Sequence, residues 1–326
     1  MEKVLILGGT QFVGRAVAEE ALRRGWRVSV FNRGTAPPPA GATPLTGDRL
    51  GDLGALTEGT WDLVVDTWKG APRAVRDSAV LLAGRAGHYT YVSSRSVYAQ
   101  PGPPGADETA PLVTGASPDA GDVAYPQAKL GGELAVAASF GDRALFARAG
   151  LILGPHENIG RLPWWLDRVS RGGTVPAPGP ADLPLQYIDS RDLARFLLDH
   201  PATGGAFDLI SPPGHTTTRA LLAACAAATG SAPEFRWLAP EQIAAAGVEP
   251  WTDLPIWLPP GELHATLHLG DPAKALAHGL ACRPAAETVA DTWAWMRASS
   301  WTSPDSVFGR RVGLSPEQEK ALLDLA

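Results

Sequence analysis

The sequence has few of the features that mark disulfide-rich or metal-binding proteins. Among its 326 residues there are only two cysteines, Cys225 and Cys282, far apart and in neither a CxxC pair nor a zinc pattern. A disulfide framework is therefore not expected, and no metal site is predicted. Both cysteines are expected to be buried thiols in a reducing compartment.

Blocks of like charge and long apolar runs are also lacking. The formal net charge is −6 and no basic stripe is present, which argues against nucleic acid or a membrane surface as a partner. No apolar run is long enough to span a bilayer, and the run at residues 4–7 is too short for the core of a signal peptide. We therefore expect a cytoplasmic protein that acts on a small-molecule substrate.

Short apolar runs do alternate with helix-like segments through the first half of the chain. The expected strands are residues 4–7, 26–31, 63–66, 88–93 and 144–153, and the expected helices are 12–24, 71–86 and 125–140. Such alternation is typical of an α/β fold in which helices cover both faces of a doubly wound parallel sheet.

The second half is interrupted by proline- and glycine-rich loops, and tryptophan is frequent near its end. Helices are expected to about residue 199, at 220–228 and at 315–325. These features predict a Rossmann domain of residues 1–155 and 186–210 with a smaller substrate-binding domain of residues 156–185 and 211–326.

The segment GGTQFVG, residues 8–14, lies between the first expected strand and the first expected helix. Glycine permits a tight turn and close approach of a pyrophosphate, and the helix N-terminus adds a favourable field. A glycine cluster alone is a weak signal, but its strand-to-helix context favours a dinucleotide site. The residues predicted to contact the cofactor here are Gly8, Thr10, Gln11, Phe12, Val13 and Gly14.

The second expected strand ends in Asn32 and Arg33 where NAD-preferring folds commonly carry an acidic residue. An arginine at this place accommodates the 2′-phosphate of NADP(H), so both residues are predicted cofactor contacts. NADP(H) is the expected cofactor, with NAD(H) as the alternative. A solvated loop arginine is the competing interpretation.

A serine-rich segment, SSRSVY at residues 93–98, follows a strand, and YPQAK at residues 125–129 begins a helix. Tyr125 and Lys129 are four residues apart and so share one helix face. A nearby ammonium lowers the pKa of a phenol that titrates near 10 in water, and a serine hydroxyl can hold the reacting oxygen. Such a tyrosine–lysine spacing is common by chance, but its combination with the serine segment and the glycine turn is far more specific.

With these motifs the chain resembles the extended short-chain dehydrogenase/reductases, also called the NAD-dependent epimerase/dehydratase family. It is most similar to atypical actinobacterial members with a GGTxFxG start and an FNRG strand end. Further marks are RAGLILGPH at residues 148–156 and QYIDSRDLA at 186–194, so the resemblance covers nearly the whole chain. One departure is Gln11, which replaces the middle glycine of the family's GxxGxxG pattern and leaves the pyrophosphate geometry open.

The resemblance implies a catalytic triad of Ser94, Tyr125 and Lys129, with Ser93 as the alternative serine. Tyr125 and Lys129 would also contact the cofactor, Lys129 through the nicotinamide ribose. Asp48 and Arg49, after the presumed third strand, are implied as contacts to the adenine part. A homodimer is implied by analogy alone.

In this fold ligands bind beyond the carboxyl ends of the strands. The predicted substrate contacts are Trp68, Tyr98, His156, Trp164, Arg168 and Gln186. The alternatives are a loop histidine with a backbone partner and tryptophans that pack in the core. Arg161, Arg168 and Arg171 are the only cationic candidates for binding a nucleotide diphosphate.

The favoured function is an NADP(H)-dependent oxidoreductase that transfers hydride between nicotinamide and a carbonyl or hydroxyl substrate, in secondary or sugar metabolism. The alternative is a sugar-nucleotide epimerase with recycled NAD(P)+. Dehydration is disfavoured because Arg95 and Ser96 stand where a dehydratase has an acidic pair. An alternative of another class is a non-catalytic dinucleotide-sensing or RNA-binding protein, since chloroplast RNA-binding relatives share the GGTxFxG start.

Overall fold

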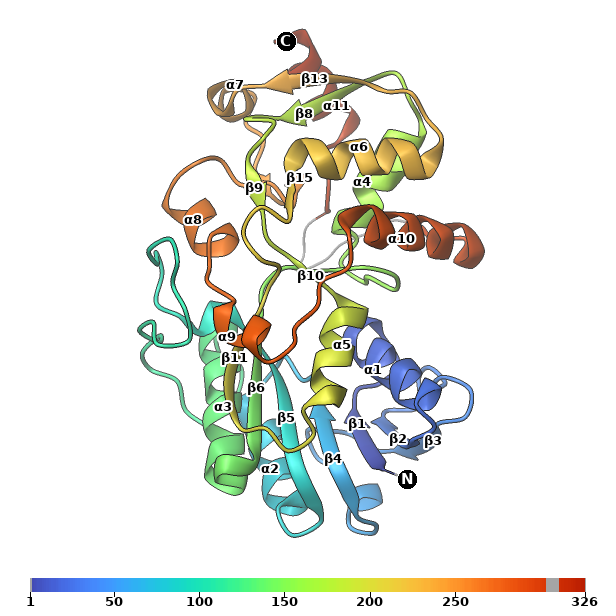
Figure 1. Cartoon of the computed structure of the whole chain (residues 1–326), viewed down its shortest axis with the longest axis vertical. Helices are drawn as coiled ribbons and strands as arrows, with labels where there is room; N and C mark the ends of the chain where they lie inside the picture. The colour runs from blue at the N-terminus through green and yellow to red at the C-terminus, as the bar shows by residue number, and fades with distance from the viewer. Residues whose placement is uncertain (1, 303–310, 326) are drawn as a thin grey trace.

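A seven-stranded, all-parallel sheet forms the lower lobe of the molecule in Figure 1, with the strands in the order β11-β6-β5-β4-β1-β2-β3. The computed structural model describes residues 2–302 and 311–325. The strands are β1 Lys3–Leu7, β2 Arg27–Asn32, β3 Thr43–Thr46, β4 Trp61–Asp66, β5 Ala86–Ser94, β6 Ala144–Ala149 and β11 Gly205–Leu209. The α/β fold with a parallel sheet predicted from the sequence is confirmed.

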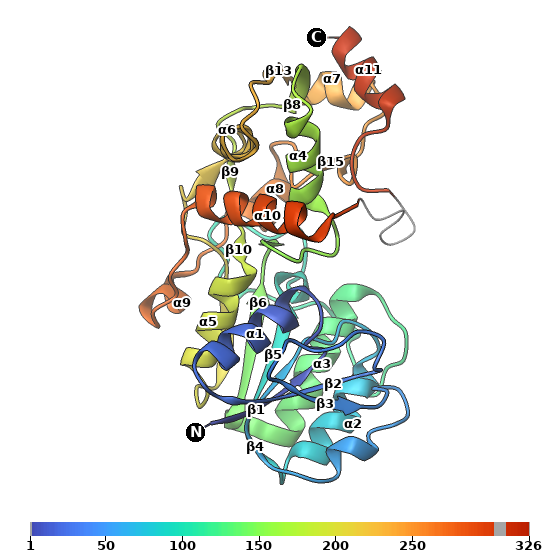
Figure 2. The same ribbon diagram turned by 90° about the vertical axis from the view of Figure 1, so that its right-hand side faces the viewer.

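Helices cover both faces of this sheet. α1 (Phe12–Arg23) and α5 (Ser190–Asp199) pack on one face, and α2 (Pro72–Leu82) and α3 (Tyr125–Phe140) on the other, as Figures 1 and 2 show. Alternate residues of β1 divide between the two layers: Val4 and Ile6 pack on the α1–α5 side and Leu5 and Leu7 on the α2–α3 side. This two-sided burial explains why residues 4–7 of β1 are all apolar.

The chain reverses its direction of winding next to β1. From β1 it proceeds outward through β2 and β3, then returns to β4 on the other side and continues to β5, β6 and β11. In open α/β sheets the crevice at the carboxyl ends of the strands beside such a switch point binds ligands. The glycine turn after β1 and the ends of β4 and β5 all lie at this edge.

The upper lobe in Figure 1 is built around three helices, α4 (Arg161–Ser170), α6 (Thr218–Thr229) and α10 (Ala285–Ser299), which pack on one another. A parallel pair of strands, β8 (Thr174–Pro178) and β13 (Glu234–Leu238), lies beside them. The other α-helices and strands of the chain, in either lobe, are β7 Ile152–Leu153, β9 Pro184–Leu185, β10 Ile188–Asp189, β12 Thr216–Thr217, β14 Pro250–Trp251, β15 Leu254–Pro255, α7 Pro240–Ala245, α8 Glu262–His268, α9 Ala273–Ala277 and α11 Pro316–Asp324. Trp165 and Trp257 are among the largest fully buried side chains of the upper lobe.

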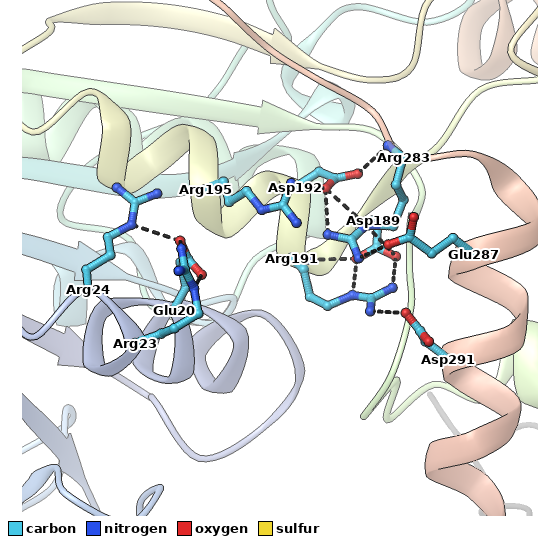
Figure 3. A network of polar contacts seen from close by, with 10 residues as sticks. All are labelled: Glu20, Arg23, Arg24, Asp189, Arg191, Asp192, Arg195, Arg283, Glu287 and Asp291. Carbon is cyan, nitrogen blue, oxygen red and sulfur yellow. Dashed lines mark hydrogen bonds and ion pairs between the residues drawn. The ribbon is translucent and has the colours of Figure 1, made fainter.

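An ion-pair network joins the two lobes, as Figure 3 shows. Asp189 and Asp192, at the start of α5, are both buried. Arg283, in the segment before α10, donates to Asp192 at 3.0 and 2.8 Å and lies 3.5 Å from Asp189. Arg191 pairs with Asp189 at 2.7 Å and also with Asp291 of α10.

Three expectations from the sequence were wrong in detail. The helix expected at 71–86 ends at Leu82, because residues from Ala86 onward pair with β4 and β6. The strand expected at 144–153 breaks at Gly150, where an added Cβ would meet Ile210 at 2.4 Å. Cys225 is buried as predicted, but Cys282 is only partly so.

The predicted domain boundaries remain a prediction, and residues 303–310 and 326 of the second predicted domain lie outside the described residues. β11 returns from the later part of the chain to pair with β6. In the part of the chain that the structure describes, no helix is both long and apolar enough to cross a membrane.

Candidate functional site

The glycine turn after β1 is shaped by two close backbone approaches. Gly8 has φ of +100°, a conformation that side chains disfavour, and its amide donates to the Phe31 carbonyl at 3.0 Å. A Cβ on Gly14 would meet the Gly8 carbonyl oxygen at 2.3 Å, so only glycine lets α1 begin this close to the strand. Gln11 at the N-cap makes no capping hydrogen bond with its side chain, so no side chain competes there with an anion.

Gln11, which stands in the place of the middle glycine of a GxxGxxG pattern, bridges to the other side of the crevice. Its side-chain oxygen accepts a hydrogen bond from Asn158 Nδ2 at 3.2 Å, and Asn158 lies in the loop between β7 and α4. The next residue, Phe12, has φ of +37°, which is uncommon for a non-glycine residue. The turn is thus tied to the second lobe at the place where the pyrophosphate is predicted to bind.

The end of β2 presents two polar side chains. Asn32 Oδ1 accepts from the Gly34 amide at 2.6 Å, whereas its Nδ2 is buried without a hydrogen-bond partner in the structure. Arg33 is exposed, and within residues 2–302 and 311–325 it makes neither an ion pair nor a hydrogen bond. An orphaned amide donor beside an uncommitted guanidinium is a suitable setting for a phosphorylated ribose.

Asp48 and Arg49, the predicted adenine contacts, have different surroundings. Asp48 is partly buried and accepts from the Leu50 amide at 2.9 Å. Arg49 is buried and donates to both oxygens of Asp66 at 2.8 Å each. Burial alone would raise the pKa of Asp66, but the charge and hydrogen bonds of Arg49 outweigh it and hold the pKa below its ordinary value. The Arg49 guanidinium is thus engaged inside the sheet lobe.

Ser94, Tyr125 and Lys129 come together at the carboxyl end of β5. Ser94 is the last residue of β5, and Tyr125 and Lys129 occupy the first two turns of α3. The hydroxyl of Ser94 lies close enough to that of Tyr125 to influence its pKa, and it donates to Ser96 Oγ and accepts from the Ser96 amide, both at 3.1 Å. Lys129 Nζ lies 6.0 Å from the centre of the Tyr125 ring. The local spacing and the packing of α3 on β5 therefore assemble the predicted triad.

The electrostatics of this cluster follow from its partial enclosure. Desolvation raises the pKa of Tyr125, while the Ser94 hydroxyl and the charge of Arg161 act to lower it. Lys129 is almost fully buried and donates to the carbonyls of Trp68 and Val92 at 2.6 and 2.7 Å. Desolvation lowers the pKa of Lys129 to about 7. An ammonium has three donors, so one remains for a ligand.

The neighbouring Ser93 has a different role in the structure. It is buried and donates to Glu133 at 2.6 Å, and Glu133 also accepts from Arg148 at 3.0 and 2.8 Å. Ser93 is thus bound within a buried polar network that holds α3 against β5 and β6. Ser94, not Ser93, lies beside Tyr125.

Of the six predicted substrate contacts, Trp68 and His156 lie near the crevice with part of their surface exposed. The Trp68 indole nitrogen donates to the Ala71 carbonyl at 3.0 Å, and its own carbonyl accepts from Lys129. His156 has φ of +66° and its ring centre is 5.1 Å from that of Trp295. Burial lowers the pKa of His156 below its ordinary value.

The other four predicted contacts are engaged in internal packing and hydrogen bonds. The Tyr98 hydroxyl donates to Asp208 at 2.7 Å. Trp164 packs edge-on against Trp165, with the two ring centres 4.7 Å apart. Arg168 pairs with Glu319 at 2.7 Å. The buried Gln186 side chain donates to the carbonyls of Ser211 and Gly270 and accepts from the Gly270 amide. Both its nitrogen and its oxygen are therefore already hydrogen-bonded within the protein.

A second group near Tyr125 contains Arg161, which the sequence suggested only as a ligand of a nucleotide diphosphate, and Glu157, which was not predicted as a site residue. Glu157 is buried and accepts from the amides of Arg161 and Leu162 at 2.7 and 3.2 Å, so that it caps α4. Arg161 lies over the Trp251 ring, with Cζ 4.9 Å from the centroid. Nothing in the sequence indicated that Arg161 and Trp251 lie together, because they are far apart in the chain.

Comparison with known proteins supports the fold. No family model matches the chain, and no curated protein does. Solved structures match over 91% of this chain with TM-scores of 0.59 to 0.65. They include the enzyme WbmH of Bordetella bronchiseptica in complex with NAD+, at 19% identity, TM-score 0.62 and 98% coverage of that chain. Others are UDP-N-acetylglucosamine 4-epimerase of Bacillus cereus, at 16%, TM-score 0.65 and 100% coverage, and UDP-glucose 4-epimerase of Thermus thermophilus with NAD, at 22%, TM-score 0.59 and 99% coverage. At these identities the likeness extends to the fold alone.

Proposed function

We propose that the chain is an NADP(H)-dependent oxidoreductase of the short-chain dehydrogenase/reductase type, acting on a carbonyl or hydroxyl substrate. The observation that carries this proposal is the cluster of Ser94, Tyr125 and Lys129 at the same sheet edge as the glycine turn. A chemistry-free nucleotide sensor would not need such a cluster. The similarity of fold to NAD-bound enzymes adds support.

The residues present fit a nicotinamide dinucleotide. Gly8 and Gly14 form a turn that a Cβ would fill, and the amides that begin α1 would receive the pyrophosphate. The unpartnered Nδ2 of Asn32 and the exposed Arg33 would receive the ribose with its 2′-phosphate. Lys129 would use its free donor on the nicotinamide ribose. Arg49 is not part of this proposed site, because its guanidinium is committed to Asp66.

When bound, the nicotinamide ring supplies or accepts the hydride. Tyr125 exchanges the proton at the substrate oxygen, and Ser94 donates a hydrogen bond that holds this oxygen in place. The guanidinium of Arg161 favours the phenolate of Tyr125. Lys129, with Nζ 6.0 Å from the centre of the Tyr125 ring, would favour it as well when protonated. This positive charge offsets part of the effect of desolvation, and the pKa of the phenol stays above its ordinary value.

The test is the balance between NADPH consumed and product formed. Purified protein is assayed with NADPH and a panel of aldehydes and ketones, with Tyr125→Phe as the matched variant. The proposal predicts one NADPH oxidised per alcohol formed and at least about a hundredfold loss of kcat in Tyr125→Phe. Two results would contradict the proposal: no turnover of any panel member although NADPH binds, or the formation of substrate isomers without net loss of NADPH.

A sugar-nucleotide epimerase remains a second candidate, because two of the solved structures named above are UDP-sugar 4-epimerases. It would use the same Ser94, Tyr125 and Lys129 but keep its cofactor bound throughout. Mass analysis of the small molecules released on denaturing the purified protein separates the two. Stoichiometric NAD+ favours the epimerase, whereas an empty protein that binds NADPH favours the reductase.

A further inference from the structure

We propose that Arg161 and Trp251 form a subsite for the carboxylate of a planar, conjugated substrate whose reacting oxygen lies at Tyr125. The inference rests on the proposed function for its reaction, but the subsite itself is argued from this chain's side chains. It names a substrate class, an aromatic or conjugated keto or hydroxy acid.

The guanidinium of Arg161 is the uncommitted group here. Within the described residues it makes no hydrogen bond and no ion pair, although it is partly buried. The carboxylate of Glu157 acts on it electrostatically, but the oxygens of Glu157 are bound to backbone amides of α4. Burial lowers the pKa of Arg161 below its ordinary value. A desolvated arginine without a hydrogen-bonded anion is costly, and a ligand carboxylate would satisfy it.

Trp251 fixes one face of this guanidinium and leaves its edge free. The Arg161 Cζ lies 4.9 Å from the Trp251 ring centre, a stacking contact that suits a planar cation. A stacked arginine still presents its N–H edge, which matches the two oxygens of a carboxylate. The exposed part of the indole beside it would contact a flat ring of the substrate.

The loop that carries Trp251 is held in an unfavourable backbone conformation. Trp251 and Ile256 have φ of +68° and +75°, values that cost bulky residues free energy. The amide of Trp251 donates to the Trp257 carbonyl at 2.9 Å, and the indole of Trp165 donates to the Pro255 carbonyl at 2.8 Å. These bonds stabilise the loop and keep Trp251 over Arg161. Strain of this kind concentrates at ligand sites.

Arg161 also lies within electrostatic reach of the proposed proton donor. Tyr125 raises the pKa of Arg161, and Arg161 lowers that of Tyr125. A substrate that presents its oxygen to Tyr125 could therefore present a nearby carboxylate to Arg161. This ion pair would fix the substrate at a second point and so orient the reacting carbon.

A single carboxylate fits this subsite better than a diphosphate. The amides at the start of α4, which would otherwise bind phosphate, are occupied by Glu157. The two other arginines considered as phosphate ligands are used elsewhere: Arg168 pairs with Glu319, and Arg171 is exposed and 3.7 Å from Asp167. One guanidinium balances one negative charge.

The first experiment measures binding without turnover. Full-length protein is titrated with benzoate, benzamide and phenyl phosphate by ligand-observed NMR, with and without saturating NADP+. We expect benzoate to bind at least about tenfold more tightly than either analogue, and Arg161→Gln to remove this preference. Arg171→Gln, next to the same helix but exposed, should leave it unchanged. Trp251→Leu should weaken benzoate binding even if Arg161→Gln fails to fold.

Equal binding of benzoate and benzamide, no binding of benzoate, or full affinity in both Arg161→Gln and Trp251→Leu would overturn the inference. Tighter binding of phenyl phosphate would overturn the choice of carboxylate. The second experiment compares phenylglyoxylate with benzaldehyde as substrates. A kcat/KM preference for the keto acid that disappears in Arg161→Gln supports the subsite. Absence of all NADPH oxidation while the benzoate preference persists counts against the proposed function and leaves the subsite standing.

Discussion

Ser93 and Ser94 are adjacent in the chain but point to opposite sides of a strand, and this decides their chemistry. Along β5 successive side chains alternate, so Ser93 reaches the buried Glu133 and Ser94 reaches Tyr125. The sequence could predict that Tyr125 and Lys129 share a helix face because their spacing is local, whereas the choice of Ser94 depended on the resemblance. The sequence could not show that Ser93 serves a buried network, since Glu133 and Arg148 are brought to it by the packing of α3 and β6.

Alanine at the two serines should therefore have different consequences. Ser94→Ala should lower kcat by about a hundredfold or more, because it removes the donor to the reacting oxygen. Its loss of stability should be about 1 kcal/mol, because Ser94 Oγ accepts from the Ser96 amide and so caps the turn after β5. Ser93→Ala should lower the free energy of unfolding by about 1–3 kcal/mol, because it leaves a buried Glu133 oxygen short of a donor. Steady-state kinetics and urea unfolding of both variants give the comparison. The reverse pattern would assign the catalytic role to Ser93.

Lys129 should make stability depend on pH. Its folded-state pKa is about 7, whereas an ordinary lysine titrates at 10.5. Below pH 7 the folded protein carries the full cost of burying the ammonium. Between these two values the unfolded chain binds a proton that the folded protein does not, so the free energy of unfolding rises with pH. Relative to Lys129→Met, wild-type protein should gain up to about 4 kcal/mol between roughly pH 7 and 10.

The measurement is chemical unfolding of the wild type and Lys129→Met in the same series of buffers. The variant serves as the control, because every other titrating group is common to both proteins. A difference in unfolding free energy that stays constant across this range would contradict a pKa of about 7 for Lys129.

At the scale of elements, the turn between β1 and α1 depends on Gly14 for close packing. Gly14→Ala places a Cβ against the Gly8 carbonyl at 2.3 Å, so α1 must shift away from the strand. We expect a loss of roughly 2 kcal/mol or more in stability and at least about a tenfold weakening of NADPH binding.

Gly84→Ala is the matched control, because nothing lies within 4 Å of the added Cβ there. It should leave both properties unchanged or add about 0.4–1 kcal/mol of stability. Thermal unfolding and NADPH titration of the two variants give the comparison. Equal behaviour would show that the turn tolerates a side chain.

The same elements show how far the sequence predicts the structure. β1, α1 and the start of α3 were predictable because their periodicity and glycine and proline signals are local. The pairs β8–β13 and β14–β15 were not, because these strands are only two to five residues long and lie in loop-rich sequence. The contact of Arg161 with Trp251 depends on how the loop around β14 and β15 packs on α4. The sequence of neither segment alone could therefore predict this contact.

For the whole molecule, the contacts of α5 with α10 and the segment before it link the two lobes. Asp192 accepts three hydrogen bonds from Arg283, at 2.8, 3.0 and 2.8 Å. Because Asp192 is in α5 and Arg283 precedes α10, this pair couples the sheet lobe to the helical lobe (Figure 3). The sequence motif around α5 predicted the helix but not its partner on the other lobe.

Asp192→Asn should destabilise the protein by about 1–3 kcal/mol, because the buried Arg283 loses the charged acceptor of three hydrogen bonds and keeps only Asp189 at 3.5 Å and Glu287 at 2.9 Å as anionic partners. Arg195→Ala is the control: Arg195 lies 3.7 Å from the same carboxylate, but its side chain is 51% exposed. It should change stability by no more than about 1 kcal/mol. Urea unfolding is the measurement, and equal effects of the two substitutions would refute a structural role for the interlobe pair.

The central claim, that the crevice beside β1 binds NADP(H) for catalysis, is tested most directly by titrating tryptophan fluorescence with NADPH and NADH. Wild-type protein should bind NADPH about 10–100 times more tightly than NADH, and Arg33→Ala should abolish this preference without weakening NADH binding. Equal affinities in the wild type, or a preference unchanged in Arg33→Ala, would contradict the assignment of NADP(H), and no binding of either cofactor would contradict the account as a whole.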